Sequence, residues 1–201
     1  LGHSMGSFIL RNYLCRYGTG IAAAVIMGTG MQGRISLRIA KMAVGIQRLF
    51  CGPRHPAKLI DKLAFGSYNK KIRSPRTKWD WLSRDEEKVD QYKADAMCGF
   101  IFTLNGFSAL FELIYRVYDK EKLAQIPAEL PVLMLEGDAD PVGGYGSAAR
   151  RAYESLAEAG IRKIELKMYA GSRHELLNET NRNEVMQDVC SWIESAVLQK
   201  R

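Results

Sequence analysis

The sequence predicts an α/β fold in which helices cover a partial parallel sheet, with a mostly helical insertion in the middle of the chain. Three observations favour this class. Short apolar runs alternate with amphipathic stretches towards both ends of the chain, a serine between two glycines opens it, and polar residues directly follow the apolar runs. A chain of 201 residues, 47% hydrophobic and 25% charged, is long enough for one globular domain with a large insertion.

The first predicted element is a sharp turn. The opening residues, LGHSMG, contain the pattern G-x-S-x-G around Ser4, in which a serine on a strand-to-helix turn holds its hydroxyl out at the edge of a sheet. We expect a Cβ at either Gly2 or Gly6 to clash, because the backbone of such a turn is crowded and strained. Only Leu1 precedes the pattern, so we expect the turn to lack its supporting strand.

A helix and a strand follow the turn. Residues 8–17 place apolar side chains at helical spacing, and Gly18 is a stop signal. The apolar run IAAAVIMGTG, residues 21–30, predicts a strand buried on both faces, as in a parallel sheet. The turn, the helix and this strand together read as part of a βαβ unit.

Residues 31–126 are predicted to form a mostly helical cap over one edge of the sheet. The periodicity is helical in residues 35–50 and 107–126. The stretch between them is rich in aromatic, charged and proline residues and shows no strand alternation. The flanking segments, residues 1–30 and 127–201, are then the two parts of the α/β core.

The alternation of strands and helices resumes after the insertion. Residues 131–143, PVLMLEGDADPVG, predict a strand that runs into an acidic loop, and residues 144–160 predict an amphipathic helix. A second strand, Ile164–Tyr169, leads into a loop that carries His174. A helix is predicted over residues 181–199. Its apolar residues are expected on one side: Val185, Val189, Trp192, Ile193, Ala196 and Val197.

Candidate catalytic residues stand just past these strands. Ser4, then Asp138 or Asp140, then His174 occur in the chain order of a Ser-Asp-His triad. A serine hydroxyl needs a base such as an imidazole to take its proton, and a carboxylate to orient that imidazole. Both aspartates follow the same strand, and spacing alone does not choose between them. The N–H of Met5 is the expected oxyanion donor.

The other histidines and the cysteines carry no expected chemistry. His55 is interpreted as a loop residue, and His3 as packing support beside the turn. We expect no metal site or other cofactor, because the histidines and cysteines lack ligand spacing. Four scattered cysteines without C-x-x-C spacing are typical of reduced thiols in a cytoplasmic protein. They are Cys15, Cys51, Cys98 and Cys190.

The net charge of +7 is concentrated in the insertion, mostly between Lys41 and Lys78. Such a patch is either a solvated basic surface or an attraction for an anionic membrane surface or substrate. No nucleic-acid-binding motif accompanies it, so nucleic acid is not an expected partner. No apolar run approaches the roughly 18 residues that a membrane-spanning helix requires.

The stretches GHSMGS, PVLMLEGDADPVG and GSRHELLNE resemble the serine hydrolases of the α/β-hydrolase fold, in the branch of monoacylglycerol lipases and bacterial lysophospholipase-like hydrolases. Residues 69–103 resemble the cap of the bacterial members. The resemblance implies that Ser4 is the nucleophile and His174 the base. It also implies that Asp140 is the acid, because the family's acid precedes a Pro-Val pair.

The resemblance further implies that the chain corresponds to the C-terminal two-thirds of such an enzyme. The family's N-terminal strands and its oxyanion loop, with the second oxyanion donor, would then lie outside these residues. We expect a polypeptide of these residues alone to be poorly stable and nearly inactive, because half of a parallel sheet exposes an apolar edge.

The substrate class implied by the resemblance is a carboxylic ester of a lipid, such as a monoacylglycerol or a lysophospholipid, cleaved through an acyl-enzyme. Aromatic residues of the cap are expected either to line a groove for the acyl chain or to build the cap's own core. They are Phe65, Tyr68, Trp79, Trp81, Phe100, Phe102, Phe107, Phe111 and Tyr115. The alternatives are an acyltransferase or a serine aminopeptidase with the same triad, and a binding protein that keeps the fold without catalysis.

Overall fold

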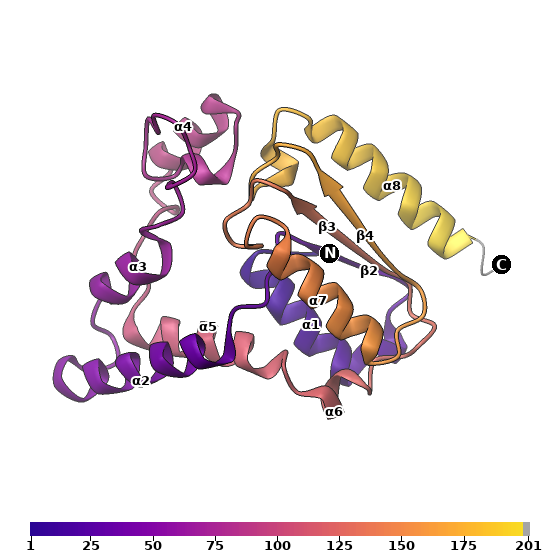
Figure 1. Ribbon diagram of the computed structural model, residues 1–201, viewed down its shortest axis with the longest axis horizontal. Helices are drawn as coiled ribbons and strands as arrows, with labels where there is room; N and C mark the ends of the chain where they lie inside the picture. The colour runs from indigo at the N-terminus through magenta and orange to yellow at the C-terminus, as the bar shows by residue number, and fades with distance from the viewer. Residues whose placement is uncertain (199–201) are drawn as a thin grey trace.

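The computed structural model describes residues 1–198, and its centre is a sheet of four parallel strands in the order β1-β2-β3-β4 (Figure 1). The strands are β1 (Gly2–His3), β2 (Ala24–Met27), β3 (Val132–Gly137) and β4 (Ile164–Tyr169). The α-helices are α1 (Met5–Tyr17), α2 (Arg34–Cys51), α3 (Lys58–Phe65), α4 (Glu86–Ala94), α5 (Leu104–Arg116), α6 (Lys120–Leu123), α7 (Ser147–Glu158) and α8 (Arg182–Leu198). Three short 3₁₀ turns are η1 (Gly18–Gly20), η2 (Asp80–Leu82) and η3 (Leu176–Asn178).

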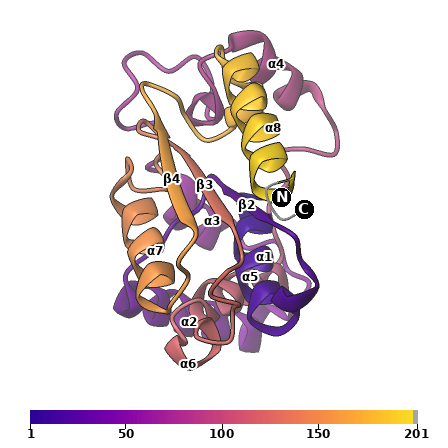
Figure 2. The ribbon, with the colours of Figure 1, turned by 90° about the vertical axis from the view of Figure 1, so that its right-hand side faces the viewer.

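Helices cover both faces of the sheet, so the predicted α/β class is confirmed. On one face, Leu14 of α1 and Leu156 of α7 pack against Ile26 and Met134 of the strands. On the other face, Val185 of α8 belongs to a second apolar cluster with the remaining strand residues. Figures 1 and 2 show the resulting layers, with α1 and α7 on one side of the strands and α8 on the other. Because β2 and β3 are buried along their whole length, their sequences are continuously apolar apart from one residue near the end of β3.

The turn at the start of the chain does have a strand before it, so the expectation that Ser4 lacks one is wrong. Gly2 and His3 form β1 and pair with Ile26 and Met27 of β2 in parallel register. The N–H of Ser4 then donates to the carbonyl oxygen of Met27 at 3.1 Å. Two residues suffice because each backbone hydrogen bond to β2 fixes the chain as it enters the turn.

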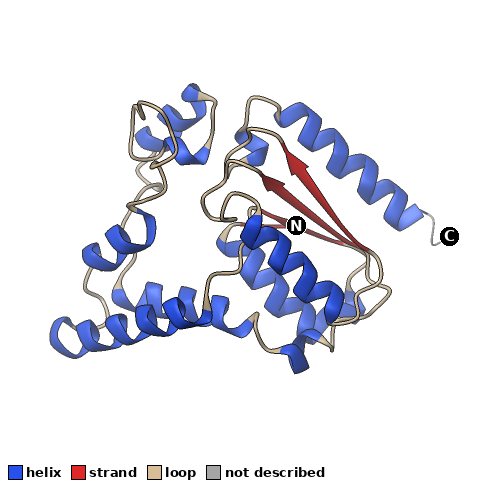
Figure 3. Cartoon of the chain, in the orientation of Figure 1, coloured by secondary structure: helices blue, strands red, loops and turns tan. Residues whose placement is uncertain are grey.

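Residues 31–126 contain helices α2 to α6 and none of the four strands. Helices α2 to α5 form the helical part at the left of Figure 3, whereas α6 lies near α1 at the bottom of the view. Helices α2 and α5 pack on each other, with Leu37 and Val44 of α2 against Phe107, Phe111 and Ile114 of α5. The helical pattern of residues 107–126 is interrupted after α5. There the Asp119 side chain accepts a hydrogen bond from the N–H of Lys122 and starts α6 as a separate helix.

The prediction for the last helix is only partly correct. Val185 and Val189 are buried and Trp192 packs on the same cluster, but Ile193 and Val197 are 39% and 37% exposed. Residue 199, the last of the predicted helix, lies outside the described residues. Within residues 1–198, the structure contains no helix with the length and apolarity needed to span a membrane.

Candidate active site

The turn between β1 and α1 presents Ser4 in a strained backbone conformation. Its φ of 53° and ψ of −120° are unfavourable for a residue with a side chain. Gly2 is required here, because a Cβ at this position would lie 2.5 Å from the carbonyl oxygen of Gly6 and 2.9 Å from Cβ of Leu10. The expected clash at Gly6 is wrong: a Cβ there meets no atom of the described chain within 4 Å.

Ser4, His174 and Asp140 form one hydrogen-bonded line. The His174 Nε2 atom lies 2.8 Å from the Ser4 Oγ atom, and His174 Nδ1 lies 2.7 Å from Asp140 Oδ2. Asp140 and His174 are buried, with side chains 0% and 2% exposed. The second carboxylate oxygen of Asp140 accepts a hydrogen bond from the N–H of Val142 at 2.7 Å, which fixes the carboxylate plane.

The structure also separates the two candidate acids. Asp138 points away from His174 and uses Oδ1 to accept a hydrogen bond from the N–H of Gly171 at 2.6 Å. It therefore ties the loop after β3 to the loop after β4. Asp140, two residues later, is the carboxylate that contacts His174, in line with the assignment that the family resemblance implies.

Electrostatics hold the His174–Asp140 pair in a defined state. Burial disfavours a charged imidazole, but the Asp140 carboxylate outweighs burial and raises the pKa of His174 above its ordinary value. Burial likewise opposes the Asp140 charge, but His174 outweighs it, so the pKa of Asp140 is lowered. The pair therefore favours an ionised carboxylate beside an imidazole that accepts a proton readily.

His3 contacts His174 through a hydrogen bond and through its ring. Its Nε2 atom lies 3.1 Å from the carbonyl oxygen of His174, and the two rings lie 4.7 Å apart. Burial, followed by the neighbouring His174, lowers the pKa of His3, which favours the neutral ring that donates to this carbonyl. Gly28, with a φ of 56°, lies against both rings: a Cβ there would be 3.0 Å from the His3 ring and 3.1 Å from His174.

Sequence reasoning missed Glu136, a fully buried carboxyl group in β3. Its Oε2 atom accepts a hydrogen bond from the N–H of Thr29, and burial, together with the nearby Asp140, raises its pKa well above the ordinary value. This shift extends the pH range over which the neutral carboxyl group is the favoured form. Thr29 in turn contacts Ser7, whose hydroxyl donates to the carbonyl oxygen of Ser4 at 2.6 Å. The sequence feature that could have identified Glu136 is that it is the single charged residue in an otherwise apolar strand.

The N–H of Met5, the expected oxyanion donor, lies at the start of α1. Met5 is the first residue of α1, and the first N–H groups of a helix have no partner within the helix. The positive end of the helix dipole lies at the same place. Met5 and Ser4 both border the main cavity.

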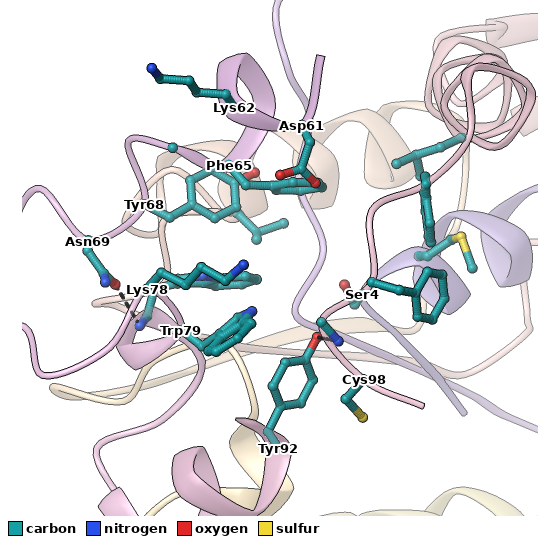
Figure 4. Close-up of a pocket in the computed structure, with 18 of the residues that line it drawn as sticks. Ser4, Asp61, Lys62, Phe65, Tyr68, Asn69, Lys78, Trp79, Tyr92 and Cys98 are labelled. Carbon is teal, nitrogen blue, oxygen red and sulfur yellow. Dashed lines mark hydrogen bonds between the residues drawn. The ribbon is translucent and has the colours of Figure 1, made fainter. Parts of the chain in front are cut away.

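A cavity of about 600 Å³ opens in front of Ser4 between the α/β core and the helical insertion. Figure 4 shows Tyr68, Trp79 and Tyr92 around the space beside Ser4. Six of the nine aromatic residues singled out from the sequence line this cavity: Phe65, Tyr68, Trp79, Trp81, Phe100 and Phe102. The others, Phe107, Phe111 and Tyr115, belong to the apolar core between α2 and α5. Phe65 and Phe102 also pack against this core, so the residues that line the cavity and those that build the core overlap.

Polar side chains line one side of this cavity. Asp61 and Lys62 of α3, Asn69 and Lys78 all border it. Burial raises the pKa of Asp61, although the charge of Lys78 opposes this shift. The cavity thus combines an aromatic wall with a small group of polar and charged groups, as in many sites for amphiphilic ligands.

The loop that carries His174 is attached to the insertion through Glu179, which sequence reasoning also missed. The buried Glu179 carboxylate accepts hydrogen bonds from Nε and the N–H of Arg84, at 2.8 and 3.0 Å, and from the N–H of Arg173 at 2.9 Å. Arg173 also donates to two carbonyl oxygens of the insertion. The histidine therefore depends on contacts with residues about 90 positions earlier in the chain.

The remaining candidate residues lie outside this arrangement. His55 is an exposed loop residue, and all four cysteines are free thiols. Within the described part of the chain, no group of three or more His, Cys, Asp or Glu side chains is positioned to hold a metal ion.

Sequence comparisons relate the chain to known proteins. Residues 1–181 match a protein-family model described as serine aminopeptidase, S33. Over 199 residues the chain is 32% identical to a monoacylglycerol lipase of Mycolicibacterium smegmatis, a match that covers 97% of this chain and 61% of that protein. The chain thus spans about three-fifths of the length of this relative.

Solved structures share the fold. A highly thermostable carboxyl esterase from Bacillus coagulans, determined in complex with glycerol, gives a TM-score of 0.86 at 25% identity, over 98% of this chain and 64% of that one. A monoglyceride lipase from Saccharomyces cerevisiae, determined with a substrate analog, gives a TM-score of 0.68 at 18% identity, over 97% of this chain and 64% of that one.

Proposed function

Because the chain belongs to the serine aminopeptidase S33 family of α/β-hydrolases, we propose that it is the catalytic part of a serine hydrolase that cleaves carboxylic esters of lipids. The observation that carries this proposal is the hydrogen-bonded line from Ser4 through His174 to Asp140. The proposed substrates are acyl esters such as monoacylglycerols and lysophospholipids.

In the proposed acylation step, the Ser4 Oγ atom attacks the ester carbonyl carbon while Nε2 of His174 takes the hydroxyl proton. Asp140 holds the imidazole in the tautomer with Nε2 free and stabilises its charged form. The N–H of Met5 donates to the oxyanion that develops on the carbonyl oxygen. The C–O bond then breaks, and His174 returns the proton to the departing alcohol.

Deacylation repeats these roles with water as the nucleophile. His174 takes a proton from the water, whose oxygen attacks the carbonyl carbon of the acyl-enzyme. The bond to Ser4 Oγ breaks, His174 gives the proton back to the serine, and the fatty acid leaves. The raised pKa of His174 suits both directions of this proton transfer.

The cavity supports a lipid-like substrate. Its aromatic wall can bury an acyl chain, while the polar group around Asp61 and Lys78 can face the more polar alcohol or head group. The names of the relatives, a monoacylglycerol lipase and a carboxyl esterase, point to the same bond type.

A second candidate is the aminopeptidase activity in the family's own description. The observation that favours it is Asp61, a carboxylate on the cavity wall that can pair with a free α-amino group. The reaction uses the same triad, and only the bond attacked differs. An acyltransferase differs only in the acceptor that resolves the acyl-enzyme.

The test combines labelling with a substrate panel. We expect the protein that contains these residues together with the family's N-terminal strands and oxyanion loop to react with a fluorophosphonate probe. We also expect it to hydrolyse monoacylglycerols and lysophosphatidylcholine faster than aminoacyl p-nitroanilides. Ser4→Ala should abolish labelling and lower kcat by at least about 10³-fold. Ser36→Ala, an exposed serine on α2, is the matched control.

Each other outcome selects an alternative. Labelling that persists in Ser4→Ala would rule out Ser4 as the nucleophile. Cleavage of the anilides alone would favour the aminopeptidase, and transfer of the acyl group to an added alcohol in preference to water would favour the acyltransferase. A folded protein that also contains the family's N-terminal strands and oxyanion loop and still does not react with the probe would be a binding protein of this fold.

A further inference from the structure

A second cavity, of about 360 Å³, shares the side chain of Tyr68 with the cavity in front of Ser4. Residues of the insertion line one part of it, and the loops that follow β3 and β4 line the rest. The proposed hydrolysis does not use this space. We call it the basic pocket, because four cationic side chains and a single carboxylate line it: Lys71, Arg73, Arg84, Arg173 and Asp138.

Most of the positive charge in the basic pocket is not neutralised by the protein. Arg84 pairs with the buried carboxylate of Glu179, its Nε atom 2.8 Å from Oε2. Within residues 1–198, no carboxylate forms an ion pair with Lys71, Arg73 or Arg173. Three cations therefore converge on one cavity without a counter-charge, which indicates a site for an anion.

Hydrogen bonds hold the two guanidinium groups of the basic pocket in place. The Nη2 atom of Arg84 donates to Ser172 Oγ at 3.0 Å and to Asn181 Oδ1 at 3.1 Å. Arg173 uses Nη1 to donate to two carbonyl oxygens of the insertion, at 2.7 and 2.9 Å. The Nη1 atom of Arg84 and the Nη2 atom of Arg173 make no hydrogen bond to any described residue. Both arginines are thus oriented in advance and keep donors for a ligand.

The two guanidinium groups also repel each other. Burial lowers the pKa of Arg173, and the positive charge of Arg84 lowers it further, although Glu179 and Asp80 oppose this shift. An anion bound in the basic pocket would offset this repulsion and stabilise both charges.

The loop of residues 69–77 brings the remaining two cations to the basic pocket. The Asn69 side chain closes this loop, because its Nδ2 atom donates to the carbonyl oxygen of Thr77 at 2.6 Å. The Nζ atom of Lys71 lies 3.5 Å from the centre of the Tyr145 ring, in the loop between β3 and α7. The loop is therefore fixed at both ends, and its lysine already faces the α/β core.

We propose that the basic pocket binds the phosphate group of a small phosphorylated ligand, and that the bound phosphate joins the insertion to the loop that carries His174. Guanidinium groups present N–H donors in a geometry that matches phosphate oxygens, and a lysine adds a point charge. A cavity of about 360 Å³ is many times the roughly 30 Å³ of one water molecule, so a phosphate group with a small organic substituent has room.

The charge of the basic pocket favours a phosphate over a carboxylate. A phosphate monoester carries a charge of about −1.5 to −2 at pH 7, whereas a carboxylate carries only one negative charge. Three cations without ion pairs are better balanced by the phosphate, since Asp138 already contributes one negative charge. Phosphate binding goes beyond the proposed function, because it does not depend on Ser4.

Isothermal titration calorimetry measures the binding, on the protein that contains these residues together with the family's N-terminal strands and oxyanion loop. The probes are inorganic phosphate and glycerol 3-phosphate, in a chloride buffer of constant ionic strength. We expect at least one of them to bind with one site per chain and to raise the melting temperature as its concentration increases. Tighter binding of glycerol 3-phosphate would identify a phosphate ester as the ligand, and tighter binding of inorganic phosphate would identify the free anion.

A pair of matched charge variants locates the site. Lys71 and Arg73 are exposed and without ion pairs, so Lys71→Gln with Arg73→Gln should keep the fold and weaken binding by about tenfold or more. Lys70→Gln with Arg54→Gln removes the same charge from exposed positions outside the basic pocket and should change the Kd by less than about twofold. Ser4→Ala should bind phosphate as the wild type does.

A variant of unchanged charge tests the cavity itself. Ile72 lines the basic pocket, and Ile72→Trp should fill part of it and weaken binding by about tenfold or more. Circular dichroism checks that each variant is folded, and the charge variants keep the test decisive if Ile72→Trp is not.

The proposal fails if neither probe binds, or if the variant of Lys71 and Arg73 binds like the wild type. It also fails if the control variant loses as much affinity, because diffuse attraction would then explain the binding, or if Ser4→Ala abolishes it, because the site would then be the other cavity. Fluorophosphonate labelling of the same preparations separates the two proposals. Labelling without phosphate binding would overturn only the present inference, and phosphate binding without labelling would overturn only the proposed function.

Discussion

At the scale of single residues, the loop after β3 assigns different tasks to two similar carboxylates. Asp140 is buried against His174, whereas Asp138 joins two loops through the N–H of Gly171. Only the first can orient the imidazole and stabilise its charged form. The difference follows from two residues of a tight turn that point in different directions, which spacing in the sequence alone does not reveal.

This division of labour predicts unequal effects of the same substitution. Asp140→Asn should lower kcat for a soluble ester by roughly 10³–10⁴-fold, because the amide no longer favours the tautomer that accepts the Ser4 proton. Asp138→Asn keeps an oxygen that accepts the Gly171 N–H, so we expect a change in kcat of less than about threefold. Steady-state kinetics of the two purified variants measure these changes in kcat. Equal losses of kcat would contradict the assignment of Asp140 as the acid.

Glu136 gives a pH-dependent prediction. Its pKa in the folded protein is raised by burial and by Asp140, so its contribution to stability is present below the unfolded pKa of roughly 4.3 and is lost as pH rises through the folded pKa. Glu136→Gln removes the ionisable group and keeps an acceptor for Thr29. We expect the melting temperature of this variant to exceed that of the wild type increasingly above pH 5, by about 2–4 °C at pH 8.

Thermal scans from pH 4 to pH 8 measure the Glu136 effect. Glu154→Gln, an exposed position on α7, removes the same kind of charge from the surface and should leave the curve of the wild type unchanged. Parallel curves for Glu136→Gln and the wild type would show that Glu136 is ionised in the folded protein.

At the scale of secondary structure, the elements with a simple local pattern were predictable. The bounds of β4 match the prediction, and β2 and β3 lie inside the predicted apolar runs. These runs are short, apolar and bounded by glycine or by charged residues, so local sequence decides them. The helices of the insertion were less defined in the sequence, because α3 and α4 are short, with 8 and 9 residues.

The residues of the candidate site likewise fall into those that local sequence predicts and those that it does not. Ser4, His174 and the loop of Asp140 follow strands and carry recognisable motifs, so they could be predicted. Glu136 and Glu179 could not be, because their roles come from burial and from partners far away in the sequence. Glu179 bonds to Arg84, 95 residues earlier. The clash expected at Gly6 was wrong because α1 turns that position towards open space.

The two glycines of the turn therefore predict opposite outcomes. Gly6→Ala places a better helix former in the first turn of α1, where the structure has room for it, and should stabilise the protein by up to about 1 kcal/mol with kcat retained. Gly2→Ala forces a Cβ against the carbonyl oxygen of Gly6. We expect a loss of about 1–3 kcal/mol and about 10²-fold in kcat, because Ser4 moves. Urea unfolding and ester hydrolysis measure both, and a Gly6→Ala variant that loses activity would contradict this view of the turn.

At the scale of the whole molecule, we propose that residues 31–126 act as a cap that completes the active site from the other side of the cavity. The cap supplies the aromatic wall, while the α/β core supplies Ser4, Asp140 and His174. The N–H of His174 and of the following residue donate to carbonyl oxygens at the end of η2, so the cap also holds the histidine loop. Substrate binding and the orientation of His174 are therefore coupled through one segment of the cap.

Glu179 is the residue on which this coupling depends. Its carboxylate is fully buried and accepts hydrogen bonds from Arg84 in the cap and from Arg173, the neighbour of His174. Glu179→Ala leaves the partly buried Arg84 guanidinium without its carboxylate partner and frees three backbone N–H groups, those of Arg84, Arg173 and Thr180. Breaking a buried pair in this way costs about 3–5 kcal/mol, whereas removing an exposed charge costs little. The exposed Glu158, which pairs with Lys120 at 3.5 Å, therefore provides the matched control as Glu158→Ala.

Urea unfolding should then show a loss of about 3–5 kcal/mol for Glu179→Ala and less than about 0.5 kcal/mol for Glu158→Ala. If Glu179 joins the cap to the histidine loop, the folded variant should also lose kcat and become sensitive to proteolysis between η2 and α4, since both ends of the contact are released together. A variant that loses stability but keeps the kcat and protease resistance of the wild type would show that Glu179 stabilises the loop without coupling it to the cap.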